Sequence, residues 1–225
     1  MDGKMTARFL KDNKHVFLEA LLIAIFVFTT GLMIGVFLET LRQSNIQELY
    51  SRSEFELLDL RVQNEILDFP DFTCEDAVRE NIKFGDRIFE EALLLQDLES
   101  SQTLTEALKQ QHRKYDLLRT LLWVNSIKIK NRCPGSFQTV VYIYNYKPSL
   151  DEKAQQKIFS KSLIELKEKA GDKVILIPIA GNMDLISTGI LMEKYNAGNL
   201  PVILIDEVPR AHEIDDLPKL ESFII

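Results

Sequence analysis

Residues 20–38 read ALLIAIFVFTTGLMIGVFL and form 19 consecutive positions without a charged side chain. At ~1.5 Å rise per residue, a helix of this length spans about 28 Å, close to the hydrocarbon thickness of a bilayer. No later stretch of the chain is as long without a charge. The sequence therefore predicts one transmembrane helix over residues 16–39, with the lipid bilayer as its partner, followed by one large polar part.

The flanks of this apolar run predict its orientation. Four basic residues lie within the first 14 positions, whereas the segment after the run is mixed in charge. Because basic residues stay on the cytoplasmic side, we expect residues 1–15 to be a cytoplasmic tail and the C-terminal domain to lie outside the cell membrane. A cleaved signal peptide is the alternative, but its apolar core is usually ~7–15 residues long and ends at a small-x-small site. This run is longer and ends in Val36-Phe37-Leu38-Glu39, which favours an uncleaved single-pass anchor.

Gly31 and Gly35 form a G-x-x-x-G pattern inside the apolar run. Such a pair lets two helix backbones approach closely, so a homodimer through Gly31 and Gly35 is one expected partnership. The alternative is that these glycines reflect only the general frequency of glycine in membrane helices.

The bulk composition, with 46% apolar and 27% charged residues, is that of a globular protein and argues against a disordered stalk. From residue 39 onward lie 23 of the 27 basic and 31 of the 34 acidic residues, which gives this part a net charge of −8. It has no basic patch, so no nucleic-acid partner is expected. Its acidity also argues against docking on anionic lipid.

Residues 40–133 predict a helical stem and an antiparallel helical hairpin. No Pro or Gly interrupts residues 40–67, and apolar residues recur there at spacings of three, four and seven, which indicates an amphipathic helix that can continue the membrane span. A break is expected over 68–72. Capping signals of the type Ser/Thr-x-x-Asp/Glu at 73–76 and 103–106 open two further helices, and the short loop between them predicts antiparallel packing.

The spacing of apolar residues also predicts which face of each hairpin helix is buried. The first helix, ending near residue 98, is expected to bury Val78, Ile82, Gly85, Phe89 and Ala92. The second helix, ending near residue 128, is expected to bury Leu104, Leu108, Tyr115, Leu118 and Leu122.

The two cysteines of the chain lie at the same end of this hairpin. Cys74 starts the first helix, and Cys133 lies just beyond the second. Outside the cell, two cysteines usually form a disulfide, so a Cys74–Cys133 bridge is expected. Closing a loop of ~60 residues would stabilise the fold by about 4 kcal/mol. The alternative is a reactive thiol, since Cys74 lies at a helix N-terminus.

The sequence pattern changes after Pro134-Gly135. Runs rich in β-branched and other apolar residues at 137–144, 173–179 and 202–206 predict strands. The second run is apolar throughout, as in a parallel sheet that is buried on both faces. A short edge strand is expected around 211–214, before a last helical turn.

Helices are expected between these strands. One begins at Ser149 and carries Ile158, Leu163 and Leu166 on its apolar face, and the next is capped by Asn182. The fold class is therefore α+α/β, with an N-terminal transmembrane helix, a helical stem and hairpin, and a C-terminal α/β domain over 137–225.

Residues 192–206, MEKYNAGNLPVILID, resemble the helix, loop, cis-proline and strand of the thioredoxins. Pro201 matches the cis-proline of that family, and Leu200 matches the residue before it. The resemblance covers residues 137–225, about 40% of the chain. It implies a thioredoxin-like domain with a groove beside Leu200 and Pro201, in which the backbone pairs with an extended peptide. The alternative is that Leu200-Pro201 only ends a loop and starts a strand.

The chain departs from the family at the active-site turn. Tyr146-Lys147-Pro148-Ser149 stands where thioredoxins carry Cys-x-x-Cys, and no cysteine follows Cys133. Dithiol exchange needs an attacking thiolate and a resolving thiol, and this domain has neither. The resemblance therefore implies peptide binding near Leu200, Pro201, Tyr146 and Lys147, without redox chemistry in the domain.

Other chemistry has little support in the sequence. His15, His112 and His212 are far apart, and no cluster has the spacing of metal ligands, so neither a metal nor a cofactor is expected. The leading hypothesis is a membrane-anchored extracytoplasmic protein without enzyme activity that binds a protein or peptide or serves as an assembly subunit. The alternatives are a thiol-disulfide redox protein that uses Cys74 and Cys133, and a purely structural subunit of a membrane complex.

Overall fold

The computed structural model describes residues 3–67, 69, 73–101 and 106–224. The chain divides into two compact units, Met1–Leu49 and Tyr50–Ile225. Most of the expected break at 68–72 and most of the capping signal at 103–106, Leu104 included, lie outside the described residues.

The first unit consists of the N-terminal part of helix α1, whose bounds are Gly3–Leu67. Within the part of the chain that the structure describes, one stretch, His15–Leu41, is long and apolar enough to cross a membrane. Its side chains are all exposed, as a helix surrounded by lipid requires. An apolar helix of the predicted length is thus confirmed.

The second unit contains the rest of α1 and a pair of helices, α2 (Cys74–Ser101) and α3 (Glu106–Arg132). Asn81 of α2 donates a hydrogen bond to Ser126 of α3 over 2.9 Å, and Tyr115 of α3 donates one to Glu91 of α2 over 2.9 Å. Early residues of one helix thus pair with late residues of the other. The expected antiparallel hairpin is confirmed, and α1 continues to Leu67 without interruption, as its sequence predicts.

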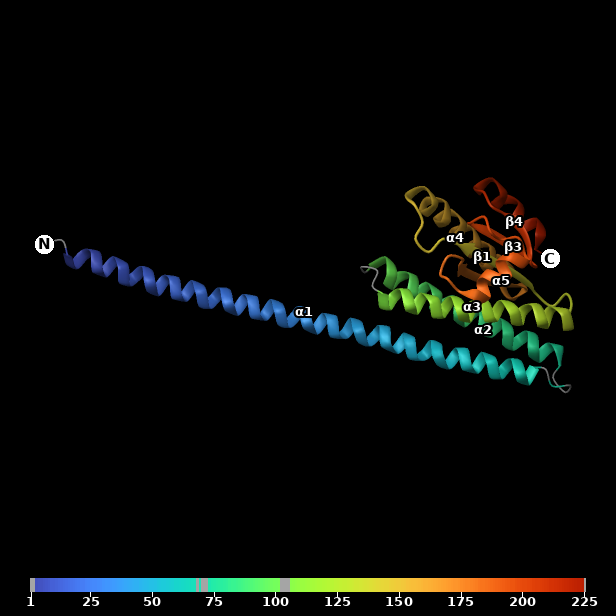
Figure 1. The fold of residues 1–225 in the computed structure, drawn as a ribbon, viewed down its shortest axis with the longest axis horizontal. Helices are drawn as coiled ribbons and strands as arrows, with labels where there is room; N and C mark the ends of the chain where they lie inside the picture. The colour runs from blue at the N-terminus through green and yellow to red at the C-terminus, as the bar shows by residue number, and fades with distance from the viewer. Residues whose placement is uncertain (1–2, 68, 70–72, 102–105, 225) are drawn as a thin grey trace. The chain divides into compact units, whose positions relative to one another are not determined.

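A four-stranded sheet follows the hairpin, with the strand order β2-β1-β3-β4 (Figure 1). Its strands are β1 (Gln138–Tyr144), β2 (Val174–Ala180), β3 (Val202–Ile205) and β4 (Val208–Ala211). Strands β1 and β2 are parallel, whereas β3 is antiparallel to both β1 and β4. The sheet is therefore mixed, and with its helices it makes an α+β arrangement.

Helices cover both faces of this sheet (Figure 1). One face packs on α4 (Leu150–Ala170) and the 3-10 segment η2 (Ile214–Phe223), where Phe159, Leu163, Leu217 and Leu220 meet the strands. The other face meets the hairpin, and α5 (Ile186–Lys194) lies against α3. A short 3-10 turn, η1 (Gly171–Lys173), connects α4 to β2.

The buried face of α2 differs from the prediction by one position. Ala77, Phe84, Ile88 and Leu95 are at most 2% exposed. Of the predicted residues Gly85 is buried, whereas Val78, Ile82, Phe89 and Ala92 are half-buried. The reason is that α2 packs on α3 as well as on the sheet, so its buried surface is wider than one stripe. The prediction for α3 is confirmed at Leu108, Tyr115, Leu118 and Leu122, all fully buried.

Three other details of the α/β part differ from the prediction. Phe159 rather than Ile158 packs under the sheet, and Ile158 is 43% exposed. Helix α5 begins at Ile186, four residues after the predicted cap. The edge strand β4 begins at Val208 rather than near residue 211, because a two-residue turn at Asp206 and Glu207 follows β3 directly.

We expect Gly85→Ala to destabilise the fold by about 1–2 kcal/mol. A Cβ at this position in α2 would lie 2.9 Å from Cγ2 of Ile175, a buried side chain of β2. Overpacking of this kind exceeds the gain of about 1 kcal/mol in helix propensity. The matched control is Gly189→Ala in α5, where a Cβ meets no atom within 4 Å, and it should raise stability in urea unfolding. Equal effects of the two substitutions would contradict this packing.

Candidate functional site

The strongest candidate site is the carboxyl edge of the sheet, where β1 and β2 end and β3 begins. Three segments meet there: 145–149 after β1, 181–185 after β2, and 196–201 before β3. The backbone N–H of Gly181 donates to the carbonyl of Tyr144 over 2.8 Å, which keeps the first two segments together beyond the strands. A Cβ on Gly181 would lie 3.0 Å from Cδ1 of Leu200, so the third segment closes over the same point.

Asn182 ties two of these segments together rather than capping a helix. Its Oδ1 accepts a hydrogen bond of 2.7 Å from the backbone N–H of Tyr146. Because this oxygen is engaged across the edge, the residue at the N-cap of α5 is Leu185, which makes no side-chain cap. The predicted cap at Asn182 was wrong, and the residue instead shapes the candidate site.

The four residues predicted to bind peptide lie at or next to this edge. The peptide bond between Leu200 and Pro201 is cis, as the resemblance implies. Leu200 is half-buried and Pro201 is buried, while Lys147 is exposed. The ring of Tyr146 is turned onto His112 of α3, with 4.4 Å between the ring centroids. Tyr146 thus bonds to Asn182, Leu200 lies close to Gly181, and Lys147 follows Tyr146 in the turn.

A histidine cluster lies beneath the edge and was not expected from the sequence. It consists of Glu99, His112, Asp116, Tyr144 and Tyr146. The Nδ1 of His112 donates to Oε1 of Glu99 over 2.8 Å, because a carboxylate can only accept. The Nε2 of His112 lies 3.1 Å from the hydroxyl of Tyr144 and 3.3 Å from Oδ2 of Asp116. The Tyr146 hydroxyl donates to the same oxygen of Glu99 over 3.3 Å.

Asp116 joins the cluster to the sheet. It is fully buried, and its Oδ1 accepts hydrogen bonds from Arg119 at 2.9 Å and from the backbone of Ala180 at 3.2 Å. Burial raises the pKa of Asp116 above its ordinary value, against the charges of His112 and Arg119, which lower it. Through its hydrogen bond to Ala180, Asp116 links α3 to the end of β2.

The two tyrosines of the cluster remain protonated. Burial raises the pKa of Tyr144, and the carboxylate of Asp116 raises it further. Burial also raises the pKa of Tyr146, with a second contribution from Glu99. Both hydroxyls therefore serve as donors rather than as nucleophiles. His112 is only 5% exposed and Asp116 is fully buried, so these two residues hold the hairpin onto the carboxyl edge from beneath.

Three apolar side chains are exposed near the carboxyl edge, beside exposed polar residues such as Lys147, Asn182 and Asp184. Leu150 and Ile186 are the first residues of α4 and α5, the helices that follow β1 and β2, and they are 88% and 83% exposed. Ile190 lies one turn further along α5 and is 59% exposed. The carboxyl ends of parallel strands lie at one edge of a sheet, so the starts of both helices flank the edge. Apolar side chains this exposed are candidates for contact with a partner.

The outer edge of β2, by contrast, is blocked. Backbone groups of a strand alternate in direction, and the N–H of Gly181 points to β1, so residues 174, 176, 178 and 180 point outward. Pro178 has no N–H, and the N–H of Ala180 is bound to Asp116. At the other end of β2, Lys167 donates to the outward carbonyl of Val174 over 2.8 Å, and the Val174 N–H is bound to Gly171. Such features discourage pairing with an added strand.

Strand β4, at the opposite edge, is also a poor template. It has four residues, and Pro209 lies in its middle, where it pairs with Leu204 of β3. A short edge strand interrupted by proline resists strand addition. Both side edges of the sheet are therefore poor templates for an added strand.

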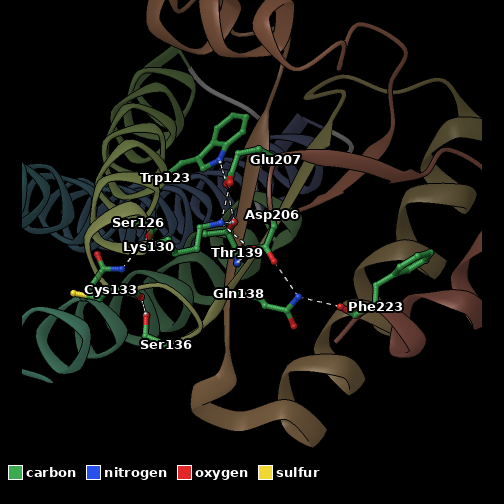
Figure 2. A network of polar contacts seen from close by, with 11 residues as sticks. Trp123, Ser126, Lys130, Cys133, Ser136, Gln138, Thr139, Asp206, Glu207 and Phe223 are labelled. Atoms are coloured by element: carbon green, nitrogen blue, oxygen red, sulfur yellow. Dashed lines mark hydrogen bonds and ion pairs between the residues drawn. The ribbon is translucent and has the colours of Figure 1, made fainter. Parts of the chain in front are cut away.

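A second buried network lies at the other end of β1 (Figure 2). Lys130 of α3 donates to Thr139 at 2.8 Å, to Asp206 at 2.7 Å and to Glu207 at 2.8 Å, which uses all three protons of its ammonium group. Asp206 and Glu207 form the β3–β4 turn and adopt positive φ angles of 48° and 65°. Glycine or asparagine usually occupies such turns, so Lys130 compensates for the presence of two acidic residues there.

The rest of this lysine network joins three more parts of the chain. Figure 2 shows Trp123 pointing toward Glu207, to which its Nε1 donates over 3.2 Å. The side-chain amide of Gln138 donates to Asp206 and to the backbone carbonyl of Phe223, each over 2.9 Å. All these partners belong to the protein itself, so the network is a structural clamp at the end of the sheet opposite to the candidate site.

We expect the lysine network to make the fold sensitive to acid. Burial alone would raise the pKa of Asp206, but hydrogen bonds from Lys130 and Gln138 hold it below its ordinary value. A depressed pKa in the folded state contributes stability that is present above the unfolded pKa of about 3.9 and is lost as pH falls through the folded value. Urea unfolding between about pH 6 and 2 should show a fall in the free energy of unfolding. In Asp206→Asn, this fall with pH should be smaller. An unchanged pH slope in that variant would contradict this role.

The expected disulfide is present. Cys74 and Cys133 are joined, with 5.6 Å between their Cα atoms and a sequence separation of 59 residues. Cys133 is buried, whereas Cys74 is exposed at the start of α2. The bridge fastens the open end of the hairpin, and the histidine cluster fastens its other end.

Among the residues that the structure describes, no group of three or more His, Cys, Asp and Glu side chains is arranged to hold a metal ion. His112 has its carboxylates on opposite sides of the ring rather than around one point. Comparison with protein-family models, with curated proteins and with solved structures found no match to this chain. The function must therefore be argued from the geometry of the chain itself.

We expect His112→Phe to lower the free energy of unfolding by about 2–3 kcal/mol, because it leaves Glu99 and the buried Asp116 without their shared partner. Tyr146→Phe removes only the long hydrogen bond to Glu99 and should cost about 1 kcal/mol or less. Urea unfolding followed by fluorescence of Trp123, the single tryptophan of the chain, measures both. If the two substitutions had the same effect, His112 would not be the centre of the cluster.

Proposed function

We propose that this protein is a membrane-anchored, extracytoplasmic, thioredoxin-like module that binds a protein or peptide partner at the carboxyl edge of its sheet without redox chemistry. The proposed fold rests on the strand order β2-β1-β3-β4, on the parallel pair β1 and β2, and on Pro201 at the start of β3. The turn that would carry the active-site cysteines reads Tyr146-Lys147-Pro148-Ser149 and contains none.

One observation carries the binding proposal, namely the high exposure of three apolar side chains at the starts of the helices that follow β1 and β2: Leu150 of α4, and Ile186 and Ile190 of α5. Burying these side chains against a partner would stabilise a complex by roughly 1.5–3 kcal/mol each. The two side edges of the sheet offer no comparable opportunity, because Pro178 and Pro209 interrupt them. The partner is therefore expected to contribute aliphatic or aromatic side chains at the carboxyl edge.

The proposed location outside the cell has two supports. The basic residues before the apolar helix favour a cytoplasmic N-terminus. The Cys74–Cys133 bridge belongs to an oxidising compartment. Protease added to intact cells from which any outer envelope has been removed should digest the C-terminal domain, and it should leave that domain intact if the orientation is reversed.

Photo-crosslinking from the folded surface tests the binding proposal. A photoreactive amino acid replaces Lys147 or Ile186 at the carboxyl edge. The control position is Lys161 on α4, whose side chain is 80% exposed. Illumination of intact membranes should give discrete crosslinked species from the first two positions and none of the same mass from Lys161. Equal crosslinking from all three positions would contradict a specific site at the edge.

A second candidate function is thiol–disulfide exchange through Cys74 and Cys133. The observation in its favour is that Cys74 is exposed at a helix start, where a thiolate would be stabilised. Alkylation with a mass tag, before and after mild reductant, separates the two functions. In a redox protein, the fraction of alkylated cysteines should rise after mild reductant. In a structural bridge, that fraction should stay near zero.

A further inference from the structure

The part of α1 in the second unit is apolar on two faces. Leu60 is 1% exposed and belongs to the core of this unit. A second set of residues forms what we call the α1 stripe: Phe55, Leu58, Val62, Ile66 and Phe69, which are 73%, 58%, 56%, 36% and 58% exposed. Phe69 lies two residues past the end of α1, and its N–H donates to the carbonyl of Ile66 over 3.0 Å, which keeps it close to the last turn.

The members of the stripe are spaced by three, four, four and three residues, so they lie along one side of the helix. This spacing is close to that of the apolar seam between two helices of a coiled coil. Arg61 is exposed and lies about 100° around the helix from the stripe. The stripe lies on the side of the helix opposite to Leu57, which is half-buried in the same unit. An intramolecular partner for α1 thus already exists on the other side.

We propose that the α1 stripe pairs with the same stripe of a second copy of this chain in a parallel dimer. A chain that is anchored by α1 presents every copy in one orientation at one level of the membrane, so equivalent residues meet in register. Confinement to the same membrane raises the effective concentration of one copy around another. Neither condition holds for an unrelated soluble partner.

The exposed area suits such a dimer. A fully exposed aromatic side chain offers about 200 Å², so the five residues together offer about 500 Å² per copy. Two copies would bury about 1,000 Å², which is the lower limit of a specific interface.

Cysteine crosslinking of the full chain tests the proposal. Val62→Cys places a thiol in the stripe, and Arg61→Cys places one on an exposed position about 100° around the helix, outside the stripe. Both native cysteines are in the disulfide, so the introduced thiol is the free one. In nanodiscs under mild oxidation, Val62→Cys should form a covalent species of twice 25.9 kDa at least tenfold faster than Arg61→Cys.

Sedimentation of the detergent-solubilised chain supplies the second arm. The wild type should have twice the monomer mass, Leu58→Ser with Val62→Ser should have the monomer mass, and Arg61→Ser should behave as the wild type. A monomeric wild type, equal crosslinking rates at positions 61 and 62, or crosslinking of Val62→Cys to a different protein would overturn the proposal. Unchanged urea unfolding of the double variant shows that a loss of pairing is not a loss of folding.

Discussion

Lys130→Met is expected to lower the free energy of unfolding by about 3 kcal/mol. The ammonium group of Lys130 is the shared partner of Asp206 and Glu207, and its removal leaves two carboxylates at one turn without a counter-charge. Breaking a buried ion pair by deleting one partner costs about 3–5 kcal/mol. We expect the lower end of this range because the side chain of Asp206 remains 38% exposed.

The matched control for this variant is Lys128→Met on the same helix. Lys128 is exposed and lies two residues before Lys130, so its substitution should change stability by less than about 0.5 kcal/mol. Urea unfolding monitored by Trp123 is suited to both variants, since Trp123 contacts Glu207 directly. Adding Asp206→Asn and Glu207→Gln to Lys130→Met should recover part of the loss. If the triple variant were less stable than Lys130→Met, the uncompensated carboxylates would not be the cause.

Removal of the disulfide is expected to have a similarly large effect. The bridge closes a loop of 59 residues, and the chain-entropy model assigns such a loop about 4 kcal/mol of stability. Cys74→Ala with Cys133→Ala should therefore unfold at markedly lower urea concentration than the oxidised protein. Alanine is preferred to serine at position 133, because Cys133 is buried and a hydroxyl would lack a partner there.

The reduced wild-type protein is the control for this pair of substitutions. If the bridge acts mainly on the unfolded chain, the reduced protein and the double variant should be equally destabilised, and the folded domain should keep its partner. A loss of less than about 1 kcal/mol would show that the hairpin ends are held by packing alone. A loss of partner binding without a loss of stability would favour the redox function instead.

Local sequence signals predicted most of the elements, because their causes lie within a few residues. Ser149 and Glu152 form the capping box that starts α4, with both reciprocal hydrogen bonds present. The apolar runs became β1, β2 and β3 within one or two residues of the predicted bounds. The cysteine pairing followed from the antiparallel hairpin, which depended only on a short loop.

The histidine cluster could not be predicted in the same way. His112 and Asp116 are polar residues on a buried face of α3, so they interrupt the apolar pattern that marks a core helix. Their partners Tyr144 and Glu99 come from other elements, and no spacing along the chain joins them. One signal was available in principle, since His112 and Asp116 are four residues apart and therefore share a helix face.

Asn182 shows a related limit. Asparagine after a strand and before a helix is a common cap, and the sequence alone cannot tell a cap from a residue that bonds across a turn. The difference came from Tyr146, which is 36 residues away in the chain and donates its N–H to Asn182. The same long-range packing decides that Phe159 rather than Ile158 faces the sheet.

The central claim is that a partner binds the apolar group at the carboxyl edge. The most direct measurement is the amount of partner that co-purifies with the full chain from solubilised membranes, compared between Ile186→Asp with Ile190→Asp and the control Ile158→Asp. All three isoleucines are exposed, so folding should be unaffected, but Ile158 lies on α4 in a groove beside η2. We expect the edge variant to lose at least nine-tenths of the partner and the control to retain it. Equal retention by both variants would contradict the claim.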